Sequence, residues 1–154
     1  MPTNTIGFFL EDYQAGEVMR HAPTKTIFES DNNLFSLLTM NHHPVHTNEA
    51  YAQAAQHGQI LVVGTLVFSI VVGMTVNDIS GKAIANLDYE RIEHLGPVFV
   101  GDTLRAESTV LDVRPSASKP DRGVLYVETT AYKQGDQPVL RFRRHVLLPK
   151  KEAQ

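Results

Sequence analysis

The chain has 154 residues, of which 42% are hydrophobic and 20% charged, as expected for one ordinary globular domain with its own core. Its formal net charge of −3 provides no field that would favour nucleic acid or an anionic membrane. The absence of cysteine excludes disulfides, thiolate metal sites and a cysteine nucleophile, and fits a reducing compartment. Residues 1–10 lack a basic region followed by an apolar core, so we expect no signal peptide and a cytoplasmic protein.

The N-terminal third predicts one strand and two short helices. Ser30 is expected to cap the first helix, with Asp31 favourable in its first turn. Asn48 is expected to cap the second helix, which ends before Gly58. The expected elements are a strand over 18–28, a helix over 31–38 and a helix over 49–56.

Residues 60–76 form an uncharged apolar segment, ILVVGTLVFSIVVGMTV. The segment is at the short limit of a membrane span, for which about 20 residues are needed. No basic cluster flanks it, and Asn77 and Asp78 follow directly, so a signal for membrane orientation is missing. A helix that is apolar on all sides also suits the centre of a globular domain. We therefore predict a long buried helix and no membrane partner.

The second half of the chain predicts an antiparallel run of strands, because polar and apolar side chains alternate with a period of two. In the last strand, the side chains expected to face inward are Leu140, Phe142, Val146 and Leu148. The expected strands cover residues 82–93, 103–114, 124–133 and 139–148, with a charged tail over 149–154. The order of elements indicates an α+β fold in a single domain over residues 1–154, with an antiparallel curled sheet wrapped around a long apolar helix.

The segment from Asn41 to His46 concentrates side chains suited to proton chemistry: three histidines and a carboxamide lie within six residues. Pro44 fixes its own φ and favours extended geometry in the residue before it. Asn41 and His46 can therefore lie on a short stiff loop with both side chains aimed into one space. An imidazole titrates near neutral pH, and a carboxamide can orient a water molecule.

Zinc is the alternative ligand for the three histidines of this loop, because imidazole binds zinc well. However, their spacing lacks a helical i, i+4 pair, and no cysteine or acidic side chain nearby completes a ligand set. We therefore expect no metal.

Several motifs in a fixed order give the chain a resemblance to a known family. They are Tyr13-x-Ala15-Gly16-Glu17, Asn41-x-His43-Pro44-Val45-His46, Tyr51-Ala52, Gly58, Gly64-Thr65-Leu66 and Pro97-Val98-Phe99-Val100-Gly101-Asp102-Thr103-Leu104. With these motifs the chain resembles the MaoC-like, R-specific enoyl-CoA hydratase/dehydratase family of hotdog folds over nearly its whole length. Residues 39–46 are similar to a branch that contains mesaconyl-CoA hydratases, also called β-methylmalyl-CoA dehydratases.

The resemblance implies a hydro-lyase that acts on 2-enoyl-CoA thioesters with a branched or dicarboxylic acyl chain. Such an enzyme adds water across the double bond or, in the reverse direction, removes water to form it. His46 falls on the family's catalytic histidine and Asn41 on its aspartate. We therefore expect His46 to move the proton while Asn41 places the water. The backbone N–H of Gly64 is implied to bind the thioester oxygen. The residues expected to bind the oxyanion or the substrate are Gly64, His43, Val63 and Thr65.

The missing carboxylate leaves two other functions open, because an amide cannot accept a proton at neutral pH. The chain could be a non-catalytic acyl-CoA-binding hotdog protein, or an acyl-CoA thioesterase. A dicarboxylic substrate supplies a physical reason for the exchange, since an aspartate beside a second negative charge would be costly to ionise. We expect no cofactor besides the CoA thioester, which is the substrate.

The resemblance also implies a homodimer or a higher assembly of dimers, because a curled sheet on one helix leaves an edge strand and an apolar flank exposed. Four arginines are candidates to bind CoA phosphates or a substrate carboxylate through charge-assisted hydrogen bonds. Arg141, Arg143 and Arg144 would otherwise form a solvated strand face. These candidates are Arg91, Arg141, Arg143 and Arg144.

Overall fold

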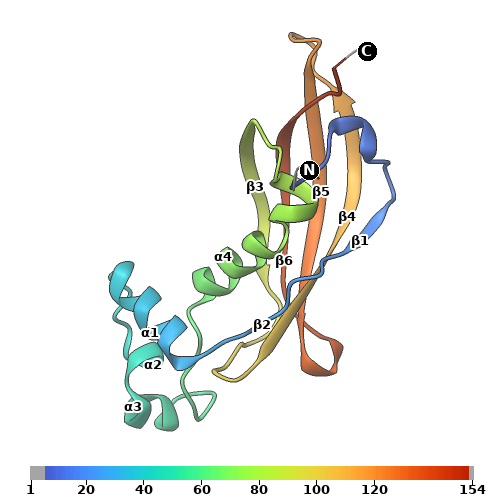
Figure 1. The fold of residues 1–154 in the computed structure, drawn as a ribbon. Helices are drawn as coiled ribbons and strands as arrows, with labels where there is room; N and C mark the ends of the chain where they lie inside the picture. Colours follow the sequence, from blue (N-terminus) through green and yellow to red (C-terminus); the bar gives the residue numbers. More distant parts are fainter. Residues whose placement is uncertain (1–5, 153–154) are drawn as a thin grey trace, which may run out of the picture.

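The computed structural model describes residues 6–152 of the chain (Figure 1). Its strands are β1 (Val18–Arg20), β2 (Lys25–Thr26), β3 (Ala85–His94), β4 (Thr103–Pro115), β5 (Arg122–Lys133) and β6 (Gln137–Pro149). Its α-helices are α1 (Glu29–Leu38), α2 (Pro44–Thr47), α3 (Glu49–Ala54) and α4 (Gly64–Met74). Short 3₁₀ or π-helical turns cover Leu10–Asp12, Val76–Ser80 and Gln134–Asp136.

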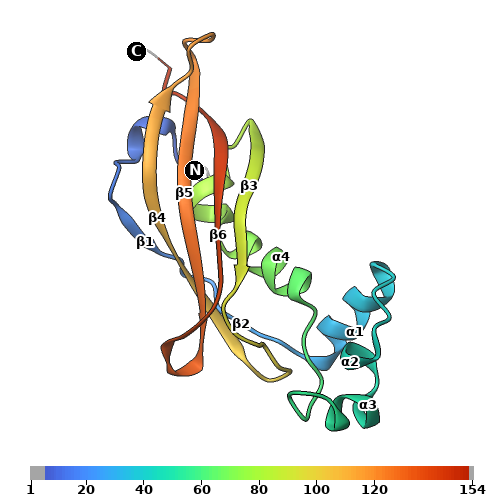
Figure 2. The same cartoon turned by 180° about the vertical axis from the view of Figure 1, so that it is seen from behind.

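All strand pairs are antiparallel, and the sheet has the order β1-β4-β5-β6-β3, with β2 also paired to β4. The sheet is curled, and α4 crosses its concave side (Figures 1 and 2). Val67 and Val71 of α4 form one core cluster with Leu104 and Phe142 of the sheet. Each such buried side chain contributes about 1.5–3 kcal/mol. The expected α+β hotdog fold is confirmed.

The apolar helix is shorter than the segment 60–76 from which it was predicted. Leu61 forms a β-bridge with Phe99, and the Val62 N–H donates to the Val98 carbonyl at 2.9 Å. These contacts hold the chain extended until α4 begins at Gly64. The helix still fills the concave side of the sheet. No helix of residues 6–152 is long and apolar enough to cross a membrane.

The four strands predicted in the second half are confirmed, with ends shifted by up to three residues. The strand expected over 18–28 is instead broken into β1 and β2. Pro23 lies in the break, and proline has no N–H to donate to the neighbouring strand. The buried His21 ring lies beside the break and hydrogen-bonds to Asp78 at 2.6 Å and to Ser108 at 2.7 Å.

The N-terminal cap of α1 differs from the prediction, because Ser30 lies inside the helix. Phe28 is the N-cap residue, and its N–H donates to the Asp31 carboxylate at 2.8 Å. Lys25 donates to the same carboxylate at 2.7 Å, and this hydrogen bond lowers the pKa of Asp31. An acidic side chain at the third helical position reaches back to the cap residue more effectively than the shorter serine. Asn48 caps α3 as predicted, although α3 ends at Ala54.

Arg144 is not part of a solvated strand face, because only 1% of its surface is exposed. Its guanidinium donates to the Thr75 hydroxyl at 2.6 Å and to the Asn86 amide oxygen at 3.1 Å. Burial lowers its pKa. Residue 144 shares the inward side of β6 with Phe142 and Val146, so its position in the alternation decides its burial.

The charged tail predicted over 149–154 is only partly a tail. Pro149 ends β6, the Lys150 N–H donates to the Asp121 carbonyl at 2.8 Å, and the Lys151 N–H donates to the Glu11 carboxylate at 3.1 Å. The remainder of the predicted tail, residues 153–154, lies outside the described residues, as does the 1–5 part of the segment inspected for a signal peptide.

One buried carboxamide joins the helical end of the molecule to α4. Asn32 of α1 is 2% exposed; its Nδ2 donates to the His46 carbonyl and its Oδ1 accepts from the Val63 N–H, both at 3.0 Å. These two hydrogen bonds connect α1, α2 and the residue just before α4. The position of His46 relative to the start of α4 therefore depends on Asn32.

Replacing Asn32 by alanine should lower the free energy of unfolding by about 1–3 kcal/mol for each backbone group left without a partner. Asn33→Ala is the matched control, because the neighbouring Asn33 is exposed on the same helix. Urea unfolding followed by circular dichroism measures both variants. Equal stability of Asn32→Ala and the parent protein would contradict the linking role of this side chain.

Candidate functional site

The helices α1, α2 and α3 gather at one end of the molecule, beyond the N-terminal end of α4 (Figures 1 and 2). The segment from Asn41 to His46 lies within this group, and Pro44 is the first residue of α2. Proline suits this position because the first N–H of a helix has no intrahelical partner. The stiff loop expected at Pro44 is therefore a short helix whose N-cap is His43.

The His46 imidazole has one strong contact. Its Nδ1 lies 2.6 Å from the Leu61 carbonyl oxygen. A carbonyl only accepts hydrogen bonds, so Nδ1 carries the proton and donates it to Leu61. In the neutral ring the other nitrogen, Nε2, is then an unprotonated acceptor. The half-buried ring thus offers a base on its Nε2 side.

His43 has a structural role at the start of α2. Its Nδ1 accepts a hydrogen bond from the Val45 N–H at 3.2 Å. Its ring packs edge-on against His46 and Tyr51, with centroid distances of 6.1 and 5.9 Å. His42 and His43 are exposed, whereas His46 and His57 are half-buried. The contact that the structure gives His43 is therefore within the loop, as the N-cap of α2.

Asn41 does not share a cavity with His46. Its Oδ1 accepts a long hydrogen bond of 3.5 Å from the His43 N–H, within the loop. The preceding Met40 has a φ of +60°, which turns the chain between α1 and the loop. Asn41 lines neither of the two cavities that border this region. Both residues lie on one loop, as predicted, but their side chains point to different places: that of Asn41 to the His43 N–H and that of His46 to the Leu61 carbonyl.

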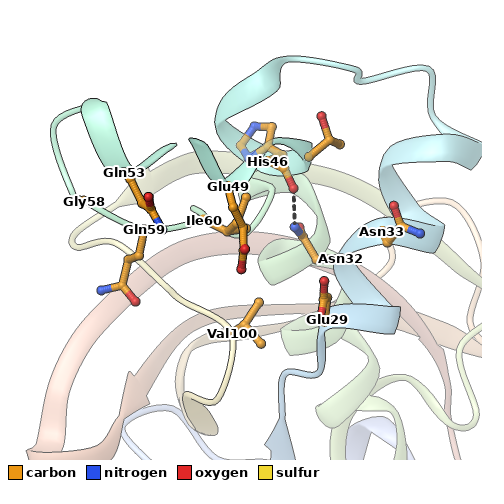
Figure 3. Close-up of a pocket in the computed structure, with 11 residues that line it drawn as sticks. Glu29, Asn32, Asn33, His46, Glu49, Gln53, Gly58, Gln59, Ile60 and Val100 are labelled. Atoms are coloured by element: carbon orange, nitrogen blue, oxygen red, sulfur yellow. Dashed lines mark hydrogen bonds between the residues drawn. The ribbon is translucent and has the colours of Figure 1, made fainter. Parts of the chain in front are cut away.

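The first cavity, of about 230 Å³, lies between α1, α2 and α3. Figure 3 shows the His46 carbonyl facing Asn32, with the imidazole on the opposite side of its backbone from Asn32 and Glu29. The remaining polar lining includes Glu49 and Gln53 of α3. This cavity is therefore bordered by the His46 backbone and by acidic and amide side chains.

The second cavity, of about 320 Å³, contains Gly64 at the first turn of α4. The first N–H groups of a helix have no acceptor within it. The Val63 N–H is bonded to Asn32, and Thr65 does not line this cavity. Gly64 thus supplies the helix-terminal N–H beside it. The side chain of Leu61 lines the same cavity, and its carbonyl is the one that accepts from His46.

Three residues of this region were missed by the sequence analysis: Asn32, His57 and His94. A signal for Asn32 exists, because asparagine is unfavourable inside a helix and usually competes with its backbone. His57 and His94 line the second cavity with Gly64. They come from a turn and from the end of a strand, and no spacing in the sequence connects them to the loop at 41–46.

The four arginines considered as anion ligands lie elsewhere. Arg143 donates to Glu128 at 2.7 Å, and Arg141 lies with Arg91 and Arg143 around a small pocket on the sheet. Arg144 is buried against Thr75 and Asn86. None of the four lines either cavity next to His46 or Gly64.

Comparisons with known proteins agree with this architecture. A mesaconyl-CoA hydratase from Cereibacter sphaeroides is 37% identical over 99% of this chain, which covers 44% of that protein. An (R)-specific enoyl-CoA hydratase from Rhodospirillum rubrum is 31% identical over 70% of this chain and 72% of that protein. The crystal structure of a putative MaoC domain protein dehydratase from Chloroflexus aurantiacus superposes with a TM-score of 0.92 and 35% identity over 99% of this chain and 43% of that one.

The chain thus spans less than half the length of the Cereibacter and Chloroflexus proteins. The sequence profile described as "MaoC like domain" matches residues 12–132. Because this match includes both the histidine loop and the start of α4, the chain belongs to the MaoC-like domain family.

Proposed function

We propose that this domain is a hydro-lyase with His46 as the acid/base. It adds water across the double bond of a 2-enoyl-CoA thioester or, in the reverse direction, removes water to form that bond. The observation that carries the proposal is the 2.6 Å contact between His46 Nδ1 and the Leu61 carbonyl. It keeps the proton on Nδ1, so that Nε2 is free to act as a base. The names of the relatives from Cereibacter sphaeroides and Rhodospirillum rubrum support the same class of reaction.

In the proposed hydration, His46 Nε2 takes a proton from water as the hydroxyl oxygen bonds to the β carbon. The electron pair of the double bond moves toward the α carbon, and negative charge develops on the thioester oxygen. The Gly64 N–H, at the positive end of the α4 dipole, stabilises that charge. The protonated His46 then returns the proton to the α carbon. One imidazole thus performs both proton transfers, and all protons and electron pairs are accounted for.

Asn41 enters this mechanism only indirectly in the present geometry. Its carboxamide oxygen accepts from the His43 N–H, and within residues 6–152 no carboxylate is hydrogen-bonded to the His46 ring. We propose that Asn41 holds the loop in place and that it orients water only if its side chain turns toward the ring on substrate binding. The acid/base work does not require a second titrating group.

Replacing His46 by glutamine should lower kcat for hydration by about 10²–10⁴-fold, because general acid–base catalysis contributes a factor of that size. The loss of absorbance of the conjugated thioester measures the rate. His42→Gln is the control, since His42 is an exposed histidine of the same loop.

Two other outcomes would indicate the alternative functions. If the parent protein releases free CoA from the thioester and the His46 variant does not, the protein is a thioesterase. Thioester binding without turnover in the parent protein would identify a binding protein, as the missing aspartate allows.

The acyl chain is proposed to carry a second carboxylate. The support is the exchange of a family carboxylate for the neutral Asn41, which removes a negative charge from the loop. Further support comes from two relatives: the mesaconyl-CoA hydratase from Cereibacter sphaeroides is 37% identical to this chain, and a protein named beta-methylmalyl-CoA dehydratase from Chloroflexus aurantiacus is 35% identical.

We expect kcat/KM for mesaconyl-CoA to exceed that for crotonyl-CoA by at least about tenfold, equivalent to roughly 1.4 kcal/mol of transition-state stabilisation. Initial rates on the two thioesters measure this ratio. Equal or faster hydration of crotonyl-CoA would remove the electrostatic explanation for Asn41.

We also propose that the domain forms a homodimer through β3. Within residues 6–152, β3 is the last strand of the sheet order and pairs only with β6. Several apolar side chains of β3 and its flanks are 40–51% exposed, which is unfavourable unless a partner covers them. They are Ile84, Leu87, Tyr89, Ile92 and Leu95.

Sedimentation at micromolar concentration should therefore show a dimer, and Leu87→Lys combined with Ile92→Lys should shift it to the monomer without unfolding it. Leu34→Lys on α1 is a control for an exposed apolar residue away from β3. A parent protein that sediments as a stable monomer would contradict this assembly.

A further inference from the structure

The cavity beside Gly64 has an unusual lining for its size. Two imidazoles, those of His57 and His94, are its titratable groups, and no lysine, arginine, aspartate or glutamate of residues 6–152 lines it. The other side chains around it are mainly aliphatic: Leu61, Val62, Val67, Leu95, Val98 and Val139. Within the described residues, the imidazoles are therefore the side chains of this cavity that can donate a hydrogen bond to a charged ligand, beside the backbone N–H of Gly64.

His94 lies directly against Gly64. A Cβ added at Gly64 would be 2.8 Å from His94 Cε1 and 3.0 Å from His94 Nε2, so the exposed His94 ring would have to shift to make room for it. Gly64 does not have the positive φ that would otherwise require glycine. The absence of a side chain at Gly64 therefore lets the His94 ring lie against the first turn of α4. No hydrogen bond of this ring is found within the described residues, so its ring nitrogens are available to a ligand.

The Gly64 N–H is the proposed donor to the thioester oxygen, and this inference rests on that proposed function. A carboxylate on the β carbon of a trans-2-enoyl thioester is three bonds from the thioester carbonyl carbon. Three bonds in a planar trans arrangement span about 3.8 Å, as between consecutive Cα atoms. A substrate held at Gly64 thus brings such a carboxylate within reach of a side chain that contacts Gly64.

We propose that the His94 imidazole binds the carboxylate on the β carbon of the acyl thioester, and thereby selects dicarboxylic over uncharged acyl chains. An imidazole N–H donates to a carboxylate in either protonation state, and the protonated ring adds charge assistance. His57 lines the same cavity and packs edge-on against Phe99 at a centroid distance of 5.6 Å. It supplies the second imidazole of this subsite.

A lysine that contacts the wall of this cavity is already engaged. Lys133 donates to the Pro97 carbonyl at 2.8 Å and to the Asp102 carboxylate at 3.3 Å, and its side chain is 12% exposed. Pro97 lines the cavity, so Lys133 supports the wall from behind. His94 therefore remains the side chain placed to bind the carboxylate of the acyl chain.

The test measures binding of two saturated thioesters that cannot be hydrated, succinyl-CoA and butyryl-CoA, by isothermal titration calorimetry. Both have the same chain length, and succinyl-CoA carries its carboxylate three bonds from the thioester carbonyl carbon. The parent protein should bind succinyl-CoA about tenfold more tightly, as one charge-assisted hydrogen bond allows. His94→Phe should abolish this preference and leave the Kd for butyryl-CoA within about twofold.

His42→Phe is the matched control and should keep the preference, because His42 is exposed outside the cavity. Gly64→Ala is a second variant that displaces the His94 ring without removing it, and it should reduce the preference as well. Thermal unfolding verifies that each variant is folded.

A succinyl preference that survives in His94→Phe, or that is missing from the parent protein, would overturn this inference. Failure of the proposed hydration is a separate outcome, seen as the absence of turnover of mesaconyl-CoA by the parent protein whatever the two Kd values are.

Discussion

The arrangement of this site depends on the hydrogen bonds of Asn32. A carboxamide has both a donor and an acceptor, so one side chain can bind a carbonyl of α2 and an N–H at the start of α4 together. No apolar or singly functional side chain could satisfy both backbone groups, and leaving either unpaired would be costly in a buried position. The helical end of the molecule, which has few other contacts with the sheet, is thereby fixed relative to the helix that begins at Gly64.

Around this link, the two proposed halves of the site meet at residues 61–64. His46 donates to the Leu61 carbonyl, and Gly64 presents an N–H three residues later. The extended segment between them is held by its pairing with the segment before β4. The short extended stretch that replaced the first turn of the predicted apolar helix therefore connects the two: His46 borders the first cavity and is bonded to Leu61, and Leu61 borders the second cavity together with Gly64.

The strands of the sheet were predicted well, because the alternation of polar and apolar side chains can be seen within each strand without knowledge of its neighbours. The same alternation places residue 144 inward, and the prediction for Arg144 was wrong because residue type was given more weight than position. The loop at 41–46 was found from its composition, since histidine and asparagine are rarely so dense. Its internal directions were not predictable, because the φ of Met40 and the contact of His46 with Leu61 depend on the folded chain. Asn32 and His94 were missed for a similar reason, as each acts on a residue at least 30 positions away.

Leu61 contributes to the site in two independent ways: its main-chain oxygen fixes the tautomer of His46, and its side chain forms part of the cavity wall. Replacing leucine with another aliphatic or aromatic residue would reshape the wall while leaving the oxygen in place. Substitutions at this position could therefore change which acyl groups fit, while the proton stays on Nδ1 of His46. Such a separation of shape from chemistry offers one route by which a single scaffold can diversify while its reaction stays the same.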